Sequence, residues 1–306
     1  MINTFPNDPH QYWDQSYLPQ KGQFFPPAIS DLVCLRMVFF PCCAPSLANR
    51  SKTCAHTFSV IQAVTNNTYY SVNVGPAHII MLNNYVPYGP TSQMYKWLEN
   101  DLANVDRTMT PWLFVTFHAP WYHTYVPHYK ENDEMRMMVQ PLLYKYQVDA
   151  VFNGHVHAYE RSAVVYQFQP NTCGIMHFTM GDGGNIEGLY KQFVDQTESV
   201  PGVVAKTPGY CANTSLYAPA SYQPSYSGRG YIDPNEPFCH TSQPEWSDWR
   251  EPAFGHGLFT LHNDTHAEWQ WKRNIDGQTY SIDHIMLMKN PAGASCSRKV
   301  WFGFEF

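Results

Sequence analysis

Short apolar runs alternate with amphipathic stretches through the middle of the chain. Strands are predicted where the runs are apolar or rich in β-branched and aromatic residues, at 68–74, 78–82, 112–117, 148–152 and 173–180. Helices are predicted at 91–102 and 131–146. Their apolar faces are Met94, Trp97, Leu98 and Leu102 in the first, and Met135, Met138, Val139, Leu142 and Leu143 in the second. Thr91-Ser92 can cap the first helix, and Pro141 is expected to kink or restart the second. Strand, helix and strand in this order predict parallel pairing and an α/β fold.

The two ends of the chain lack this regularity. Residues 1–67 show no sustained periodicity, and we expect a divergent, loosely packed N-terminal segment there. Residues 190–253 form a long excursion rich in Tyr, Pro and Ser. Cys211 and Cys239 bracket its tyrosine-rich part, and we expect a disulfide between them. Residues 255–272 predict a hairpin that turns at Asn263-Asp264, and an irregular tail is expected after residue 290.

Composition narrows the class of protein. The 306 residues suit one large domain or two small ones, and 24 prolines, 16% aromatic and only 14% charged residues favour a strand-rich fold with long loops. A net charge of −6 without a basic run argues against a nucleic-acid or anionic-membrane partner. No apolar stretch reaches the roughly 18–20 residues that span a bilayer.

Eight cysteines and four Asn-x-Ser/Thr sites favour an oxidising, extracellular compartment. The N-terminus, in contrast, contains no readable signal peptide, because no basic start precedes an apolar stretch. We therefore expect a secreted protein whose sequence here lacks its secretory signal.

Side chains that could bind a metal ion or take part in catalysis come directly after the predicted strands. His118 comes after the run at 112–117, His155 and His157 after the run at 148–152, and Asp182 after the run at 173–180. Ligands of open α/β sheets bind at the carboxyl ends of the strands, and imidazole is a common ligand of zinc and iron. The alternative is that these are polar loop histidines with ordinary hydrogen bonds.

Two of these segments also resemble known metal-binding motifs. Asn-Gly-His-Val-His-Ala-Tyr-Glu-Arg at 153–161 and Phe-His-Ala-Pro-Trp-Tyr at 117–122 resemble motifs of the purple acid phosphatases, which are calcineurin-like metallophosphoesterases. Further blocks of that family stand in the expected order at 97–102, 181–185 and 254–257. The resemblance implies a partial metallophosphoesterase β-sandwich flanked by helices. It places a partial catalytic domain at 68–166, a C-terminal region at 172–290 and a tail at 291–306.

The resemblance also implies ligand roles. His118 and His155 match ligands of a divalent metal (Zn, Mn or Fe), and His157 matches a ligand of Fe(III). His128 matches a histidine that binds phosphate or protonates the leaving alcohol. The family hydrolyses phosphate monoesters with two metals, which clamp the attacking and leaving oxygens.

Asp182 and His256 have two open interpretations. They could orient the metal ligands, or they could be turn residues that the local backbone requires.

The chain also departs from the family pattern. Gly-Asp-x-Gly, Gly-Asp-x-x-Tyr and Gly-Asn-His-Glu motifs, which supply aspartate, tyrosine and asparagine ligands, are absent from residues 1–67. Three neutral imidazoles do not offset the about five positive charges of an Fe(III)–M(II) pair. We therefore expect incomplete metal occupancy and impaired turnover, and we do not expect Asp8, Asp14 or Asp31 to point into the site. Two alternatives stay open, namely a non-catalytic protein that binds one zinc or phosphate, and a truncated gene product.

Overall fold

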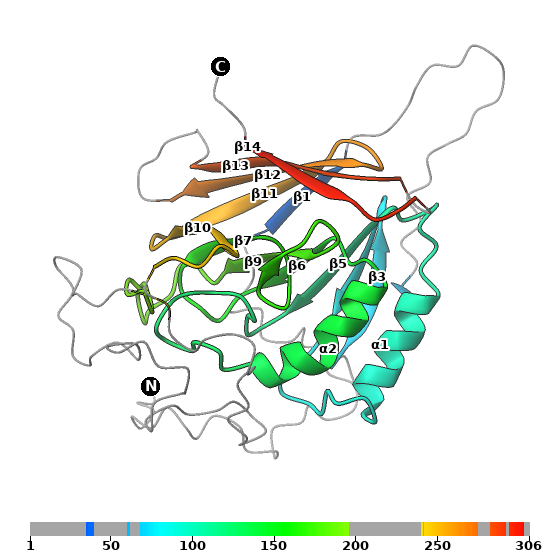
Figure 1. Ribbon diagram of the computed structural model, residues 1–306, viewed down its shortest axis with the longest axis horizontal. Coiled ribbons are helices and arrows are strands. Elements are labelled where there is room, and N and C mark those ends of the chain that lie inside the picture. The colour runs from blue at the N-terminus through cyan, green and yellow to red at the C-terminus, as the bar shows by residue number, and fades with distance from the viewer. Residues whose placement is uncertain are drawn as a thin grey trace, which may run out of the picture. The chain divides into compact units, whose positions relative to one another are not determined.

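The computed structural model describes residues 35–39, 60–61, 68–195, 240, 242–274, 282–291 and 294–302. These residues form two sheets and two helices (Figure 1). One sheet has the strand order β1 (Leu35–Phe39), β11 (Gly255–Leu261), β12 (His266–Arg273), β13 (Asp283–Lys289) and β14 (Arg298–Phe302). The other has the order β10 (Ser247–Glu251), β7 (Tyr159–Tyr166), β9 (Ile175–Met180), β6 (Ala150–Asn153), β5 (Trp112–Phe117), β4 (Ala77–Met81), β3 (Tyr70–Val74) and β2 (Val60–Ile61), with β8 (Gln169–Pro170) beside β7.

The centre of the larger sheet is parallel. Strands β4, β5, β6 and β9 are parallel neighbours, as the order of predicted elements implied. Every residue of β6 and β9 is buried, which is the pattern of a strand covered on both faces. The carboxyl ends of these strands therefore meet at one edge of the sheet, and their amino ends meet at the other.

Helices α1 (Gln93–Ala103) and α2 (Asp133–Lys145) cover one face of this sheet. Ser92 caps α1, because its side-chain oxygen accepts a hydrogen bond from the backbone N–H of Tyr95. Helix α2 continues through Pro141, so the expected restart does not occur. Met138 is 38% exposed and was wrongly assigned to the buried face, since it lies at the margin of the stripe that the other four apolar residues form.

The five-stranded sheet covers the opposite face through aromatic packing. Phe114 lies 5.3 Å from Phe259 between ring centroids, and Phe178 lies 4.6 Å from Trp269. Polar contacts cross the same interface. The Trp271 indole donates to Asp182 at 2.6 Å. The resulting layers are sheet, sheet and helices (Figure 1), which confirms the expected α/β sandwich.

Several strands lie where no regular structure was expected. Strands β1 and β2 fall within 1–67, β10 lies in the excursion, and β14 lies in the expected tail. Strand β1 pairs with β11 and β10 pairs with β7, both of them distant in sequence, and such pairing leaves no local periodic signal. Strand β2 is only two residues long, and β14 pairs with the preceding strand β13. A disulfide between Cys173 and Cys296 also joins the tail to the segment before β9.

Some expectations fall on residues outside the described ones. These are the Cys211–Cys239 disulfide, the positions of Asp8, Asp14 and Asp31, and the loose packing of most of 1–67. Within the described part of the chain, neither helix has the length and apolar character to cross a membrane.

Gly257 offers a test of the sheet-to-sheet packing. A Cβ atom built at Gly257 would lie 1.7 Å from the Trp269 ring, whereas one at Gly89 meets nothing within 4 Å. We expect Gly257→Ala to lower the free energy of unfolding by about 1–3 kcal/mol or more, because the buried indole must move. Urea unfolding of Gly257→Ala beside Gly89→Ala measures the difference. Equal midpoints for the two variants would contradict this packing.

Asp182 offers a test by pH. Burial raises the pKa of this carboxyl from 3.8 to about 7. The folded state therefore holds the proton more tightly than the unfolded state, and that stabilisation is complete below pH 3.8 and is lost as pH rises through about 7. We expect the free energy of unfolding to fall over this interval by at most about 1.4 kcal/mol per pH unit because of Asp182.

In Asp182→Asn this contribution should disappear, since a neutral amide oxygen still accepts the Trp271 hydrogen bond. Urea unfolding of both proteins from pH 4 to 8 isolates the contribution, because every other titrating group is shared. Stability curves that stay parallel would show that Asp182 does not titrate in this range.

Candidate metal centre

Two histidines meet at the carboxyl edge of the parallel strands. Strands β5 and β6 are in register with Phe117 opposite Asn153, so the residues that follow them lie side by side. The Nε2 atom of His118 is 2.9 Å from Nδ1 of His155. The backbone N–H of Gly154 donates to the His118 carbonyl at 2.9 Å, which holds the two segments together. The structure thus brings His118 and His155 together as the sequence predicted.

The loop before α2 adds a third histidine and a carboxylate. The His128 ring lies 3.9 Å from the His155 ring between centroids. Glu131 Oε2 is 2.5 Å from Nδ1 of His128 and 3.3 Å from Nε2 of His155. One donor atom from each of His128, Glu131 and His155 lies within 4.8 Å of the other two. Together with His118, which contacts His155, we call these residues the histidine cluster.

Glu131 was not among the predicted site residues. Its only sequence signal is the His-x-x-Glu spacing just before α2. Burial alone would raise the pKa of this carboxyl, but hydrogen bonds with His128 and His155 lower it below its usual range. The cluster therefore contains a charged carboxylate beside its imidazoles.

Unusual backbone geometry places the histidines. His128 and His155 have φ angles of 62° and 63°, in the left-handed region that non-glycine residues seldom adopt. His155 is the central residue of a γ-turn, because the N–H of Val156 donates to the Gly154 carbonyl at 2.7 Å. The following turn is similar, with the N–H of Ala158 donating to the Val156 carbonyl at 2.8 Å around His157.

His157 has a different set of neighbours. Its ring stacks on Tyr190 at 4.6 Å between centroids, and its Nε2 is 3.1 Å from Nδ2 of Asn185. Its Nδ1 is 3.8 Å from a carboxylate oxygen of Glu187. The Tyr190 hydroxyl in turn lies 3.3 Å from Nε2 of His128. His157 thus borders the cluster through Tyr190 and lies outside the group of three with close donor atoms.

Asp182 and His256 make contacts of a structural kind. Asp182 follows β9 at the same edge, but its Oδ2 accepts from the Trp271 indole and its backbone carbonyl accepts from Gly255. His256 is exposed on β11, with Nδ1 2.8 Å from Oδ1 of Asn274. These contacts favour the turn and packing interpretation over the orienting one.

The donor set of the histidine cluster fits a divalent metal ion. Imidazole nitrogen and carboxylate oxygen both bind zinc and iron(II). Two nitrogen ligands on one zinc ion are at most about 4.2 Å apart, since each Zn–N bond is about 2.1 Å. The 2.9 Å between His118 Nε2 and His155 Nδ1 lies within this limit, and the donor atoms of His128, Glu131 and His155 all lie within 4.8 Å of one another.

Sequence comparisons show which family the chain is similar to. Residues 44–159 match the calcineurin-like phosphoesterase family, and residues 227–281 match the family described as iron/zinc purple acid phosphatase-like protein C. Purple acid phosphatase 15 of Arabidopsis thaliana is 39% identical over 227 residues, which are 74% of this chain and 40% of that protein. The purple acid phosphatase of Glycine max is 35% identical over 248 residues, which are 76% of this chain and 44% of that protein.

A solved structure shares the fold. The purple acid phosphatase from yellow lupin (Lupinus luteus) seeds has a TM-score of 0.50 and 21% identity, covering 72% of this chain and 33% of that one. The chain spans about two-fifths of the length of these curated relatives. With the calcineurin-like match, the C-terminal match and these relatives together, the chain belongs to the purple acid phosphatase family.

Proposed function

We propose that this chain hydrolyses phosphate monoesters at the histidine cluster with the help of a divalent metal ion. The observation that carries the proposal is the 2.9 Å approach of His118 to His155 at the carboxyl ends of neighbouring parallel strands. His118 and His155 would hold the ion, and Glu131 adds negative charge beside it. Such an ion supplies Lewis-acid activation and neutralises phosphoryl charge when it is bound.

His128 acts on the substrate in this proposal. Glu131 contacts its Nδ1 and thereby fixes the orientation of the ring, which leaves Nε2 near the Tyr190 hydroxyl. From there His128 would bind a phosphate oxygen or donate a proton to the leaving alcohol. His157 matches, by family resemblance, a ligand of a second ion, Fe(III), which a complete ligand set would hold at the border of the cluster.

The number of carboxylates limits the expected rate. Among the described side chains, Glu131 is the carboxylate that contacts the cluster histidines, and Glu187 approaches His157 from an exposed position. A ferric and a divalent ion together carry more charge than these groups neutralise. We therefore propose that one divalent ion binds and that turnover is below that of a protein with the complete ligand set.

The low carboxylate count also favours a second function. A non-catalytic protein that binds one metal ion and phosphate needs no second ion and no bridging carboxylate. The two functions differ in turnover, and this difference decides between them.

Secretion is part of the proposal. The Cys173–Cys296 disulfide favours an oxidising compartment, and the Asn-x-Thr motif at Asn263 is exposed at the hairpin turn between β11 and β12. Both features suit an extracellular phosphatase.

The first test is hydrolysis of an aryl phosphate at acid pH with added zinc, manganese or iron(II). We expect slow turnover that His155→Ala lowers at least about tenfold, because the substitution removes an imidazole from the cluster. His284→Ala is the matched control, since His284 pairs with Glu268 on the five-stranded sheet. Metal binding without turnover would favour the non-catalytic function, and equal rates in both variants would exclude the cluster as the site.

The second test concerns Glu131 as a metal-binding group. We expect Glu131→Gln to weaken zinc binding by about tenfold or more, because the amide removes the charge that the cluster places beside the ion. Glu134→Gln serves as control, since Glu134 lies three residues further on, in the first turn of α2, and accepts from Tyr88 instead. Zinc titration with a competing chelator gives both affinities. If the two variants bind zinc equally well, Glu131 has no part in the site.

A further inference from the structure

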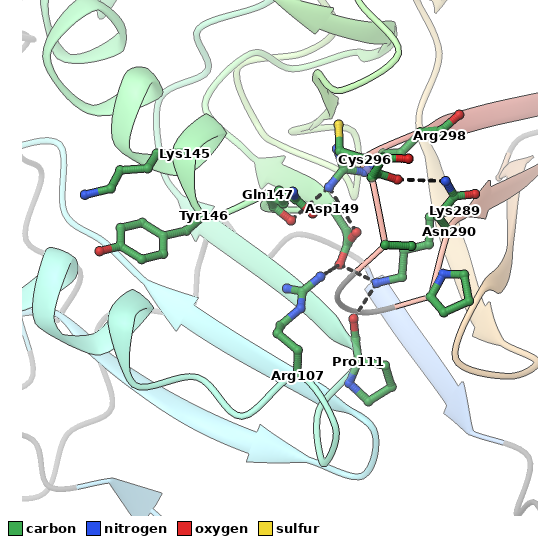
Figure 2. A pocket seen from close by; sticks show the side chains of 14 residues that line it. Arg107, Pro111, Lys145, Tyr146, Gln147, Asp149, Lys289, Asn290, Cys296 and Arg298 are labelled. Atoms are coloured by element: carbon green, nitrogen blue, oxygen red, sulfur yellow. Dashed lines mark hydrogen bonds and ion pairs between the residues drawn. The ribbon is translucent and has the colours of Figure 1, made fainter.

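A second polar site lies at the opposite edge of the parallel strands. Asp149 directly precedes β6, whereas His155 follows it, so the two mark opposite ends of one buried strand. Beside Asp149 is a cavity of about 250 Å³ lined by Arg107, Lys289, Arg298 and the Cys296 segment (Figure 2). This volume is below that of most organic-ligand pockets and suits a small ion.

Positive charge exceeds negative charge in this cavity. Figure 2 shows Asp149 at the centre of three cationic side chains. Its carboxylate oxygens lie 2.9 Å from Arg107 Nη2, 2.8 Å from Lys289 Nζ and 3.2 Å from Arg298 Nη2. Lys145 also lines the cavity, but its side chain is 61% exposed and pairs with Glu99. Asp149 is the only acidic residue among the described residues that line the cavity, so its three cationic neighbours leave two positive charges unbalanced.

The surplus is costly because the charges are buried. The side chains of Lys289 and Arg298 are only 7% and 4% exposed, and that of Asp149 is fully buried. Burial, with the neighbouring Arg107 and Arg298, lowers the pKa of Lys289 to about 8 even though Asp149 acts against it. An anion in the cavity would relieve this repulsion.

Donor groups for such an anion are present. Arg107 Nη1 and Arg298 Nε are buried nitrogens with no hydrogen-bond partner in the described structure. Buried guanidinium N–H groups are nearly always paired, so two unpaired ones at one cavity call for an explanation. Guanidinium groups bind phosphate-type oxyanions with two or more directed hydrogen bonds.

We propose that Arg107, Lys289 and Arg298 form a binding site for a dianionic tetrahedral oxyanion of the phosphate class, separate from the histidine cluster. Two negative charges match the surplus of two positive charges, and the oxyanion accepts from the two unpaired guanidinium nitrogens. The site joins the amino ends of β5 and β6 to the segment before β14. Anion binding therefore stabilises the fold at this edge.

The test is isothermal titration with inorganic phosphate at pH 7.5 and constant ionic strength. Because the histidine cluster is itself proposed to bind phosphate, the titration uses His155→Ala as the starting protein. We expect one phosphate per chain in His155→Ala, and binding weakened about tenfold or more when Arg107→Gln is added. Adding Lys96→Gln instead should change nothing. This substitution removes the same charge, but Lys96 is exposed on α1 and does not line the cavity.

The outcomes separate the two phosphate sites. Phosphate binding that survives in His155→Ala and is lost with Arg107→Gln supports the proposal even if the chain has no phosphatase activity. No phosphate binding in His155→Ala, or equal binding after Arg107→Gln, overturns it. If Arg107→Gln fails to fold, Lys289→Met replaces it, because methionine keeps an unbranched apolar side chain and removes only the ammonium group, which lies 4.0 Å from the centroid of the Trp112 ring.

A second arm identifies the source of the oxyanion. Phenyl phosphate is titrated into His155→Ala beside inorganic phosphate. Tighter binding of inorganic phosphate assigns the cavity to the free ion, and tighter binding of the ester assigns it to a phosphoryl group on a larger molecule. Both results support the site, whereas weak binding of both ligands overturns it.

Discussion

Strands β5 and β6 are covered by helices on one face and by the five-stranded sheet on the other. Backbone groups in such a double-sided core must pair within the sheet, and the side chains there must be almost entirely apolar. Polar chemistry is therefore confined to the two edges where the strands begin and end. The histidine cluster occupies the carboxyl edge, and Asp149 with its three cations occupies the amino edge. Both sites result from the same parallel pairing.

At the amino edge, one buried carboxylate organises distant segments. Asp149 accepts a hydrogen bond from the backbone N–H of Leu113 at 2.9 Å, which aligns β6 with β5. Burial alone would raise its pKa, but Lys289, Arg107 and Arg298 lower it below the usual range, so the carboxylate stays charged. Arg298 also donates to the carbonyls of Cys173 and Gly174. These contacts, together with the disulfide, explain why the expected tail is ordered and continues into β14.

The sequence predicted the elements whose signal is local. Strands β5, β6 and β9 are apolar runs, and α1 has both a cap and helical spacing, so neighbouring residues suffice to identify them. Strand β10 has the largely polar sequence Ser-Asp-Trp-Arg-Glu and is a strand because Arg250 pairs opposite Glu160 of β7. Such pairing depends on a partner some ninety residues away, and no local pattern records it.

The candidate site, like the fold, was predicted from the sequence only in part. Position after a strand was enough to predict that His118 and His155 meet. It was not enough for His157, because two consecutive γ-turns give His155 and His157 different neighbours despite their separation by one residue. Glu131 is one of 25 acidic residues, and only the return of the loop toward β6 distinguishes it.

The fold and the ligand set draw on different residues. The aromatic interface between the sheets comes from side chains within strands, such as Phe152 and Trp269, whereas the cluster comes from loop residues beyond the strand ends. Loops exchange residues with little effect on a core that they do not enter. A chain can therefore keep the layered fold of its family while its metal ligands change. Membership in the family thus accounts for the sandwich, and the chemistry must be established from the few side chains that meet at its carboxyl edge.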